Sequence, residues 1–171
     1  PLVFCNQVGG QDSLIFDGRS KVVDEKGEVI SQACGFDEDF VITDLAKGTG
    51  EINDLVDLPV MSAVHDGLVL GVRDYVRKCG FASVVIGLSG GIDSALTAAI
   101  AVSALGPDKV LGIAMPSPYS SEGSLNDARD LAHNLGCNFR VIPIEPLFNQ
   151  FNTSLSDIFD GRDEDLTEQN I

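Results

Sequence analysis

Apolar residues follow two different spacings along the chain. Residues 1–45 contain short β-branched or aromatic runs separated by turn residues such as Gly9-Gly10, and this pattern predicts antiparallel strands. The runs are PLVFCNQV, SLIFDGRSKVV, EVISQAC and DFVITDL. From residue 61 to Val76 the apolar residues recur at steps of three and four, which predicts a helix that ends near Gly80.

After this helix, continuous apolar runs alternate with segments of helical spacing. Strands are expected at residues 83–88, 109–115 and 139–145. Helices are expected from the turn after Leu88 to Leu105 and over residues 120–136. In the second helix Ser124 and Asp127 have the spacing of a capping box, and Gly136 is placed to end it. This alternation predicts an α/β fold, in which right-handed βαβ units form a parallel sheet with helices on both faces.

A boundary between the two regions is expected where neither spacing holds. Residues 46–60 are rich in Gly, Asp and Pro and show no sustained period, which is typical of a linker. The predicted organisation is therefore a β region at 1–45, a linker at 46–60 and an α/β domain at 61–171.

The net charge of the chain limits the classes of molecule that are expected to bind it. The chain has 26 acidic against 11 basic residues, a formal net charge of −15, and no basic patch in its sequence. Such a surface repels phosphate backbones and anionic lipids, so neither nucleic acid nor a membrane is expected as a partner. No apolar run approaches the ~18 residues of a membrane span. The four cysteines are too widely spaced for a CxxC motif, and a cytoplasmic location is expected.

The turn between the first predicted strand and helix of the α/β region contains the residues best suited to bind a ligand. Its sequence, Ser-Gly-Gly-Ile-Asp-Ser at residues 89–94, places two glycines where main-chain N–H groups and the helix dipole can meet an anion. Both glycines are expected to allow positive φ, and Ser89 or Ser94 is expected to cap the helix. Asp93 would repel a phosphate unless Mg²⁺ lay between them. The pattern is neither GxxxxGK[ST] nor GxGxxG. A phosphate site is thus favoured over the alternative, an ordinary capped turn.

The same six residues resemble the SGGxDS pyrophosphate loop of N-type ATP pyrophosphatases. The flanking segments VVIGLSGGIDSALTAAIA, MPSPYSSEGSLNDA, VIPIEPLF and LTEQNI are similar to glutamine-dependent NAD synthetase. So is PLVFCNQVGGQDSLIFDGRS, which resembles the end of that family's nitrilase-like glutaminase domain. The resemblance implies that 1–45 are strands left from a nitrilase-like α/β sandwich. It also implies that 61–171 are the first part of an ATP-binding domain with the adenine nucleotide alpha-hydrolase-like fold.

The resemblance also implies an activity and its ligands. ATP would adenylate deamido-NAD with release of pyrophosphate, and ammonia from glutamine would then displace AMP to give NAD. Asp93 would be the Mg²⁺ ligand, and Asn170 would contact deamido-NAD. The residues expected to bind ATP are Gly87, Leu88, Ser89, Gly90, Gly91, Ile92, Asp93, Ser94, Ser117 and Ser121. For Ser117 and Ser121 a turn or cap role is an equal alternative.

Parts of the family pattern are not found in the chain. The glutaminase Glu, Lys and Cys would precede Pro1, and a GTxxxxE segment would follow Ile171, so no catalytic residue is assigned. We expect a fragment that is inactive alone, from an intact enzyme that forms a homo-oligomer. Cys5 is expected to be a buried structural thiol. The alternatives are another ligase with this loop, GMP synthetase-like or tRNA-modifying, and a non-catalytic nucleotide-binding module.

Overall fold

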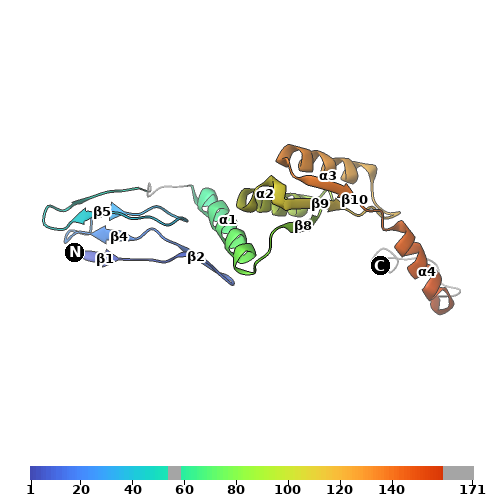
Figure 1. Cartoon of the computed structure of the whole chain (residues 1–171), viewed down its shortest axis with the longest axis horizontal. Helices are drawn as coiled ribbons and strands as arrows, with labels where there is room; N and C mark the ends of the chain where they lie inside the picture. The colour runs from blue at the N-terminus through green and yellow to red at the C-terminus, as the bar shows by residue number, and fades with distance from the viewer. Residues whose placement is uncertain (54–58, 160–171) are drawn as a thin grey trace. The chain divides into compact units, whose positions relative to one another are not determined.

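The chain divides into two compact units. A computed structural model describes residues 1–53 and 59–159 (Figure 1). The first unit is Pro1–Ala82 and the second is Ser83–Ile171. The first holds the predicted β region together with the first helix, and the second holds the predicted strand–helix alternation.

The first unit contains short antiparallel strands, as predicted. One sheet has the order β1-β4-β5, and the two other pairs are β2-β3 and β6-β7. The strands are β1 (Leu2–Phe4), β2 (Val8–Gln11), β3 (Leu14–Asp17), β4 (Lys21–Val23), β5 (Val29–Gln32), β6 (Thr43–Asp44) and β7 (Thr49–Gly50). Gly9 and Gly10 do not form a turn, because they lie within β2; the hairpin turns at Asp12, whose φ is 51°.

The start of the expected linker is attached to β5. The N–H of Gln32 donates to the Glu51 carbonyl at 2.9 Å, and the N–H of Asn53 donates to the Gln32 carbonyl at 2.8 Å. Gln32 and Ser31 are both buried. Residues 51–53 therefore pair with the first unit.

The first helix, α1 (Val60–Lys78), packs on the β2-β3 hairpin. It begins after Pro59, which cannot donate an N–H to a preceding turn, and it buries Gly67, Leu70 and Val76. Gly80, just beyond its end, has φ +75°, so the predicted stop is confirmed.

The second unit is a parallel three-stranded sheet with helices, which confirms the predicted α/β fold, although the two helices that connect its strands lie on one face and not on both. Its order is β10-β9-β8, with β8 (Val84–Gly87), β9 (Val110–Ala114) and β10 (Asn138–Val141). Because spatial order follows chain order, right-handed crossovers bring both connecting helices to one face of the sheet. These helices, α2 (Ile92–Leu105) and α3 (Glu122–Leu135), contact each other there.

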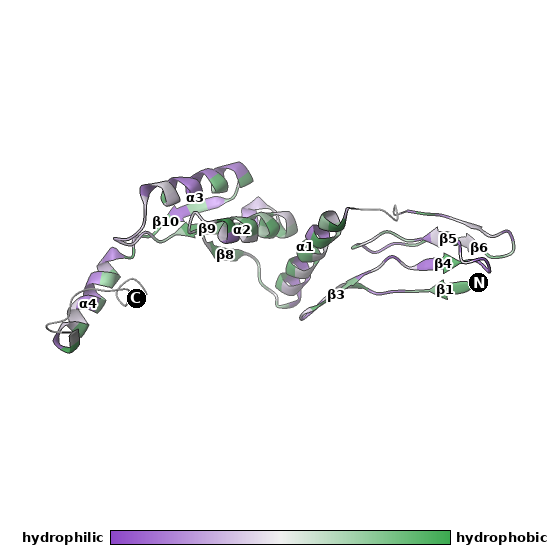
Figure 2. Ribbon diagram, turned by 180° about the vertical axis from the view of Figure 1, so that it is seen from behind, coloured by the Kyte–Doolittle hydropathy of each residue, from purple (hydrophilic) through white to green (hydrophobic). Residues whose placement is uncertain are grey.

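A small core of alanines lets the two helices lie close to the sheet. Leu88 from the end of β8, Ala98 of α2, and Ala128 and Ala132 of α3 are all buried in one cluster. The helices differ on their other sides: α2 is apolar along most of its surface, whereas α3 carries far more polar residues (Figure 2). Helix α3 therefore has the amphipathic pattern of a surface helix, and α2 does not.

The C-terminal ends of these helices agree with the prediction, whereas the N-cap of α3 does not. Gly106 ends α2 before the short 3₁₀ turn η1 (Pro107–Lys109), and Gly136 ends α3 with φ 70°. The predicted capping box of Ser124 and Asp127 is wrong. The cap of α3 is Ser121, whose side-chain oxygen accepts the N–H of Ser124 at 3.0 Å.

A fourth helix, α4 (Glu145–Phe159), was not predicted. Its apolar residues Leu147, Phe151 and Leu155 recur at steps of four, and the Phe148 ring packs edge-on against Tyr119 with ring centroids 5.6 Å apart. None of the helices within the described residues is both long and apolar enough to cross a bilayer.

Candidate functional site

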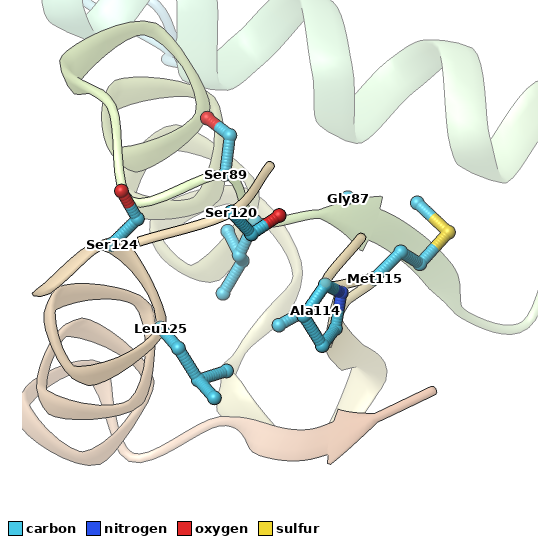
Figure 3. Close-up of a pocket in the computed structure, with 9 residues that line it drawn as sticks. Gly87, Ser89, Ala114, Met115, Ser120, Ser124 and Leu125 are labelled. Atoms are coloured by element: carbon cyan, nitrogen blue, oxygen red, sulfur yellow. The ribbon is translucent and has the colours of Figure 1, made fainter. Parts of the chain in front are cut away.

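The SGGIDS loop leaves the carboxyl end of β8 beside a pocket. Ligands of open α/β sheets bind at this edge, where the carboxyl ends of parallel strands meet. The pocket has a volume of about 280 Å³ and lies between the ends of β8 and β9 and the start of α3 (Figure 3). Its lining residues are Gly87, Leu88, Ser89, Ala114, Met115, Pro116, Ser120, Ser124 and Leu125.

Two serines of the loop form hydrogen bonds within it. The N–H of Gly91 donates to Ser89 Oγ at 3.2 Å, and the hydroxyl of Ser94 donates to the Gly91 carbonyl at 3.0 Å. The two hydroxyl oxygens are 3.2 Å apart. Neither serine is the cap of α2, so that prediction is wrong: the N-cap is Gly91, and no side chain among the described residues caps it.

Main-chain N–H groups at the start of α2 have no acceptor within the helix and can bond to a ligand. The first bond of the helical ladder runs from the Ala95 N–H to the Gly91 carbonyl, at 3.1 Å. The N–H groups of Ile92, Asp93 and Ser94 precede it and so have no partner within the helix. Together with the dipole of this 14-residue helix they favour an anion.

The two glycines of the loop differ in backbone conformation. Gly90 has φ +81°, and a Cβ there would lie 2.4 Å from the main-chain oxygen of Ser124. Gly91 has φ −88°, so the expected positive φ at this residue is wrong. Gly90 is therefore the position at which the first turn of α3 packs directly against the loop.

Asp93 is placed in the first turn of α2 and is exposed. Its main-chain oxygen accepts the Thr97 hydroxyl at 2.8 Å. No group of three or more His, Cys, Asp or Glu residues that could hold a metal ion occurs in the described part of the chain. A site with one carboxylate fits Mg²⁺, which is commonly held by one or two carboxylates together with substrate phosphates.

Ser117 and Ser121 take the turn and cap positions of the segment between β9 and α3. The N–H of Ser117 donates to Ser120 Oγ at 2.9 Å, and Ser121 caps α3. Three serines line the pocket: the expected Ser89, and Ser120 and Ser124, which were not expected. Sequence reasoning missed Ser120 and Ser124, and their spacing gave no signal, because Ser120 precedes α3 while Ser124 lies within it. Asn170 lies outside the described residues.

The thiol of Cys5, expected to be buried, is exposed in this structure. Its Sγ lies 4.0 Å from the hydroxyl oxygen of Ser20.

Comparison with known proteins places the chain in a family. The sequence model of the NAD synthase family matches residues 64–171. A glutamine-dependent NAD(+) synthetase of Synechocystis sp. is 47% identical over 175 residues, which covers 100% of this chain and 31% of the relative. The chain thus spans about a third of the length of the curated relatives that it matches.

Solved structures agree. The glutamine-dependent NAD+ synthetase of Acinetobacter baumannii, in complex with ADP, matches with a TM-score of 0.89 and 42% identity, over 98% of this chain and 32% of that one. The NH3-dependent NAD synthetase of Campylobacter jejuni matches with a TM-score of 0.56 and 27% identity, over 64% of this chain and 45% of that one. By its loop, its fold and these matches, the chain belongs to the NAD synthase family.

Proposed function

We propose that the chain provides the ATP phosphate site of a glutamine-dependent NAD synthetase, which amidates deamido-NAD to NAD. The observation that carries the proposal is the start of α2, where no side chain of the described residues caps the helix and the first N–H groups of the SGGIDS segment have no acceptor within the helix. This turn directly follows Gly87, Leu88 and Ser89, which line a pocket of about 280 Å³. That volume is close to the ~300 Å³ at which small-molecule sites begin. The apolar side chains of Met115 and Leu125 would contact the adenosine part of ATP.

The first chemical step forms an adenylate. The nicotinate carboxylate of deamido-NAD attacks the α-phosphorus of ATP, the bond to the β-phosphate oxygen breaks, and pyrophosphate leaves with the bonding electrons. Negative charge therefore grows on the pyrophosphate. The N–H groups of Ile92, Asp93 and Ser94 stabilise that charge because they are fixed by the helix before the reaction starts. Asp93 would hold Mg²⁺, which when bound neutralises phosphate charge and polarises the phosphoryl oxygens.

The second step transfers nitrogen. Ammonia attacks the carbonyl carbon of the adenylate, AMP leaves, and one proton of the nitrogen is lost to give the amide. We propose glutamine as the source of ammonia, because the relatives named glutamine-dependent match nearly the whole chain, whereas the ammonia-dependent relative matches 64% of it. Asn170 is proposed to contact deamido-NAD. The chain alone is proposed to bind ATP without completing either half-reaction. It spans about a third of its relatives' length, and catalysis needs all the groups that position the reactants.

Binding of ATP to the chain tests the phosphate site directly. Titration calorimetry is expected to show ATP uptake that strengthens with Mg²⁺, and Asp93→Asn should remove most of the Mg²⁺ effect because it removes the one carboxylate at the loop. Asp108→Asn, in the 3₁₀ turn at the other end of α2, is the control and should behave like the parent. ATP binding that is absent, or equally strong with and without Mg²⁺, would contradict the proposal.

Activity is tested in a chimera. The chain takes the place of the matching segment of the Synechocystis relative, and exchange of labelled pyrophosphate into ATP is measured with and without deamido-NAD. Exchange that requires deamido-NAD is expected for a synthetase. Binding without exchange would favour a nucleotide-binding module, and exchange that depends on another acceptor would favour a different ligase.

A further inference from the structure

Along the edge of β2 that faces away from β3, main-chain N–H and C=O groups are not bonded to the other strand of the hairpin. Its register pairs Gly9 with Phe16, Gly10 with Ile15 and Gln11 with Leu14. The Gly18 N–H donates to the Gln7 carbonyl at 2.9 Å, which continues the ladder. In an antiparallel pair the bonded positions alternate, so with Gln7 bonded the N–H and C=O of Gly10 point away from β3.

Helix α1 supplies partners for both of these groups. Asp74 Oδ2 accepts the Gly10 N–H at 2.8 Å, and the ammonium of Lys78 donates to the Gly10 carbonyl. Asp74 and Lys78 are one helical turn apart, and Lys78 Nζ lies 3.9 Å from Asp74 Oδ2. The side chain of Asp74 is only 18% exposed, and Gly10 is buried. Two α1 side chains thus bond to Gly10 in the way that a neighbouring strand would.

The backbones of helix and hairpin also approach closely. A Cβ on Gly10 would lie 3.2 Å from Gly71 Cα, and a Cβ on Gly71 would lie 3.0 Å from Cδ1 of Ile15. Both contacts are tighter than ordinary van der Waals packing, so glycine at both positions is what lets the helix rest directly on the hairpin. The hydrogen bonds to Gly10 therefore act across an interface with little freedom to shift.

This interface joins two parts of the chain that the comparisons distinguish. The family match begins at residue 64, so it includes nearly all of α1 and excludes the hairpin. The glutamine-dependent relative from Acinetobacter baumannii matches 98% of the chain, hairpin included, against 64% for the ammonia-dependent one.

We propose that Asp74, with Lys78, is a positioning residue that docks the hairpin on α1, and that this docking couples glutamine-derived ammonia to NAD synthesis. The coupling rests on the function proposed above, whereas the docking itself does not. If the contact only stabilised the fold, its loss would lower synthesis from glutamine and from free ammonia alike. A coupling role predicts that NAD synthesis from glutamine falls while synthesis from free ammonia is kept.

Hydrogen exchange on the 171-residue chain tests the docking. Asp74→Ala removes the acceptor of the Gly10 N–H, and exchange of that amide is expected to rise about fivefold, the change that loss of one net hydrogen bond gives. Asp66→Ala, two turns earlier on α1, removes a carboxylate that contacts the neighbouring His65 ring and is the control. If Asp74→Ala does not fold, Asp74→Asn removes the charge that strengthens this hydrogen bond, and a smaller rise in exchange is expected. Unchanged exchange at Gly10 in the folded variant would overturn the docking.

The ratio of two activities tests the coupling in the chimera described above. Asp74→Ala is expected to lower NAD formation from glutamine about tenfold relative to formation from ammonium, within the range of mutations that change coupling between sites. Asp66→Ala should leave the ratio unchanged. An equal fall with both nitrogen sources would overturn the coupling. If the unmodified chimera forms NAD from neither source, the proposed function and the coupling fail together, and the exchange measurement still decides the docking.

Discussion

Gly90 shows how one residue fixes the shape of the loop. Its φ of +81° lies in the region that disfavours side chains, and the main chain of Ser124 occupies the space that a Cβ would need. Any larger residue would have to separate the loop from the first turn of α3. The pocket between them would then change shape.

Gly90→Ala is accordingly expected to lower both stability and ATP affinity. The unfavourable φ alone costs about 1–2 kcal/mol, and the contact with Ser124 adds to it. The matched control is Gly106→Ala, because Gly106 has a similar φ of +87° but, apart from its chain neighbours, no described residue has an atom within 4 Å of its Cβ position. Urea unfolding and ATP titration of the two variants should separate the effects. A Gly90 variant no worse than the Gly106 variant in both measurements would contradict this account.

Sequence reasoning at this scale found the loop and missed its details. Two glycines and two serines between an apolar strand and an apolar helix were enough to predict a phosphate site. Which glycine needs positive φ was not predictable, because Gly90 owes its conformation to the approach of Ser124, which is more than 30 positions away in the chain. The pocket-lining role of Ser120 and Ser124 depends on the same packing.

At the scale of elements, the cap of α3 has a defined energetic effect. Ser121 Oγ accepts the Ser124 N–H at 3.0 Å and lies 2.8 Å from the Ser124 hydroxyl oxygen. Loss of a serine cap typically costs ~1 kcal/mol. Because the first turn of α3 also packs on Gly90, this cap supports the pocket as well as the helix.

Ser121→Ala should therefore lower the free energy of unfolding by about 1 kcal/mol. Asp127→Ala provides the contrast, since Asp127 was expected in a capping box but is an exposed residue beyond the first turn. Its effect should be within about 0.5 kcal/mol, as for most surface substitutions. Urea unfolding followed by circular dichroism measures both, and a larger loss for the Asp127 variant would restore the capping box.

Elements with strong periodicity or clear boundary signals were predictable and the others were not. Strands β8 and β9 are short apolar runs, and helices α1 and α3 carry clear apolar spacing and end near glycines. Helix α2 lacks such spacing and was predictable from its bounds, the SGGIDS turn and Gly106. Several neighbouring serines could each have capped α3, and Ser121 is the cap because its extended backbone, with ψ 149°, lets its side chain accept the Ser124 N–H. Helix α4 was missed because its Asn, Thr and Ser residues are weak helix formers and Pro146 stands near its start. Proline is well tolerated in a first turn, so Pro146 should have been taken as a start signal.

At the scale of the whole molecule, acid is expected to act on the first unit through three aspartates. The pKa of Asp39 is lowered, first by the side-chain amide of Asn53 and then by the N–H of Cys34. Main-chain hydrogen bonds from Glu28 and from Lys47 likewise lower the pKa of Asp24 and of Asp44. The folded state therefore holds these protons less tightly than the unfolded state. The resulting stability is present above the ordinary aspartate pKa of about 3.9 and is lost as pH falls through the lower folded values.

Asp39→Asn tests this dependence. At pH 6 the variant should unfold at a lower urea concentration than the parent, and the difference should shrink at pH 3 because the parent has by then lost part of the same contribution. Asp130→Asn, an exposed residue of α3, controls for the change in net charge. A difference between parent and Asp39 variant that stays constant between the two pH values would count against the assignment.

The start of α2 has one more consequence. A helix whose first turn lacks a capping side chain is less stable than it could be, and an anion that bonds to Ile92, Asp93 and Ser94 would complete it from outside. Ligands that bind only the folded state raise the melting temperature, and the rise grows with the logarithm of the ratio of ligand concentration to dissociation constant. A simple heating series with phosphate, pyrophosphate, ADP and ATP would thus rank how many phosphates this turn recognises, without any assay of turnover.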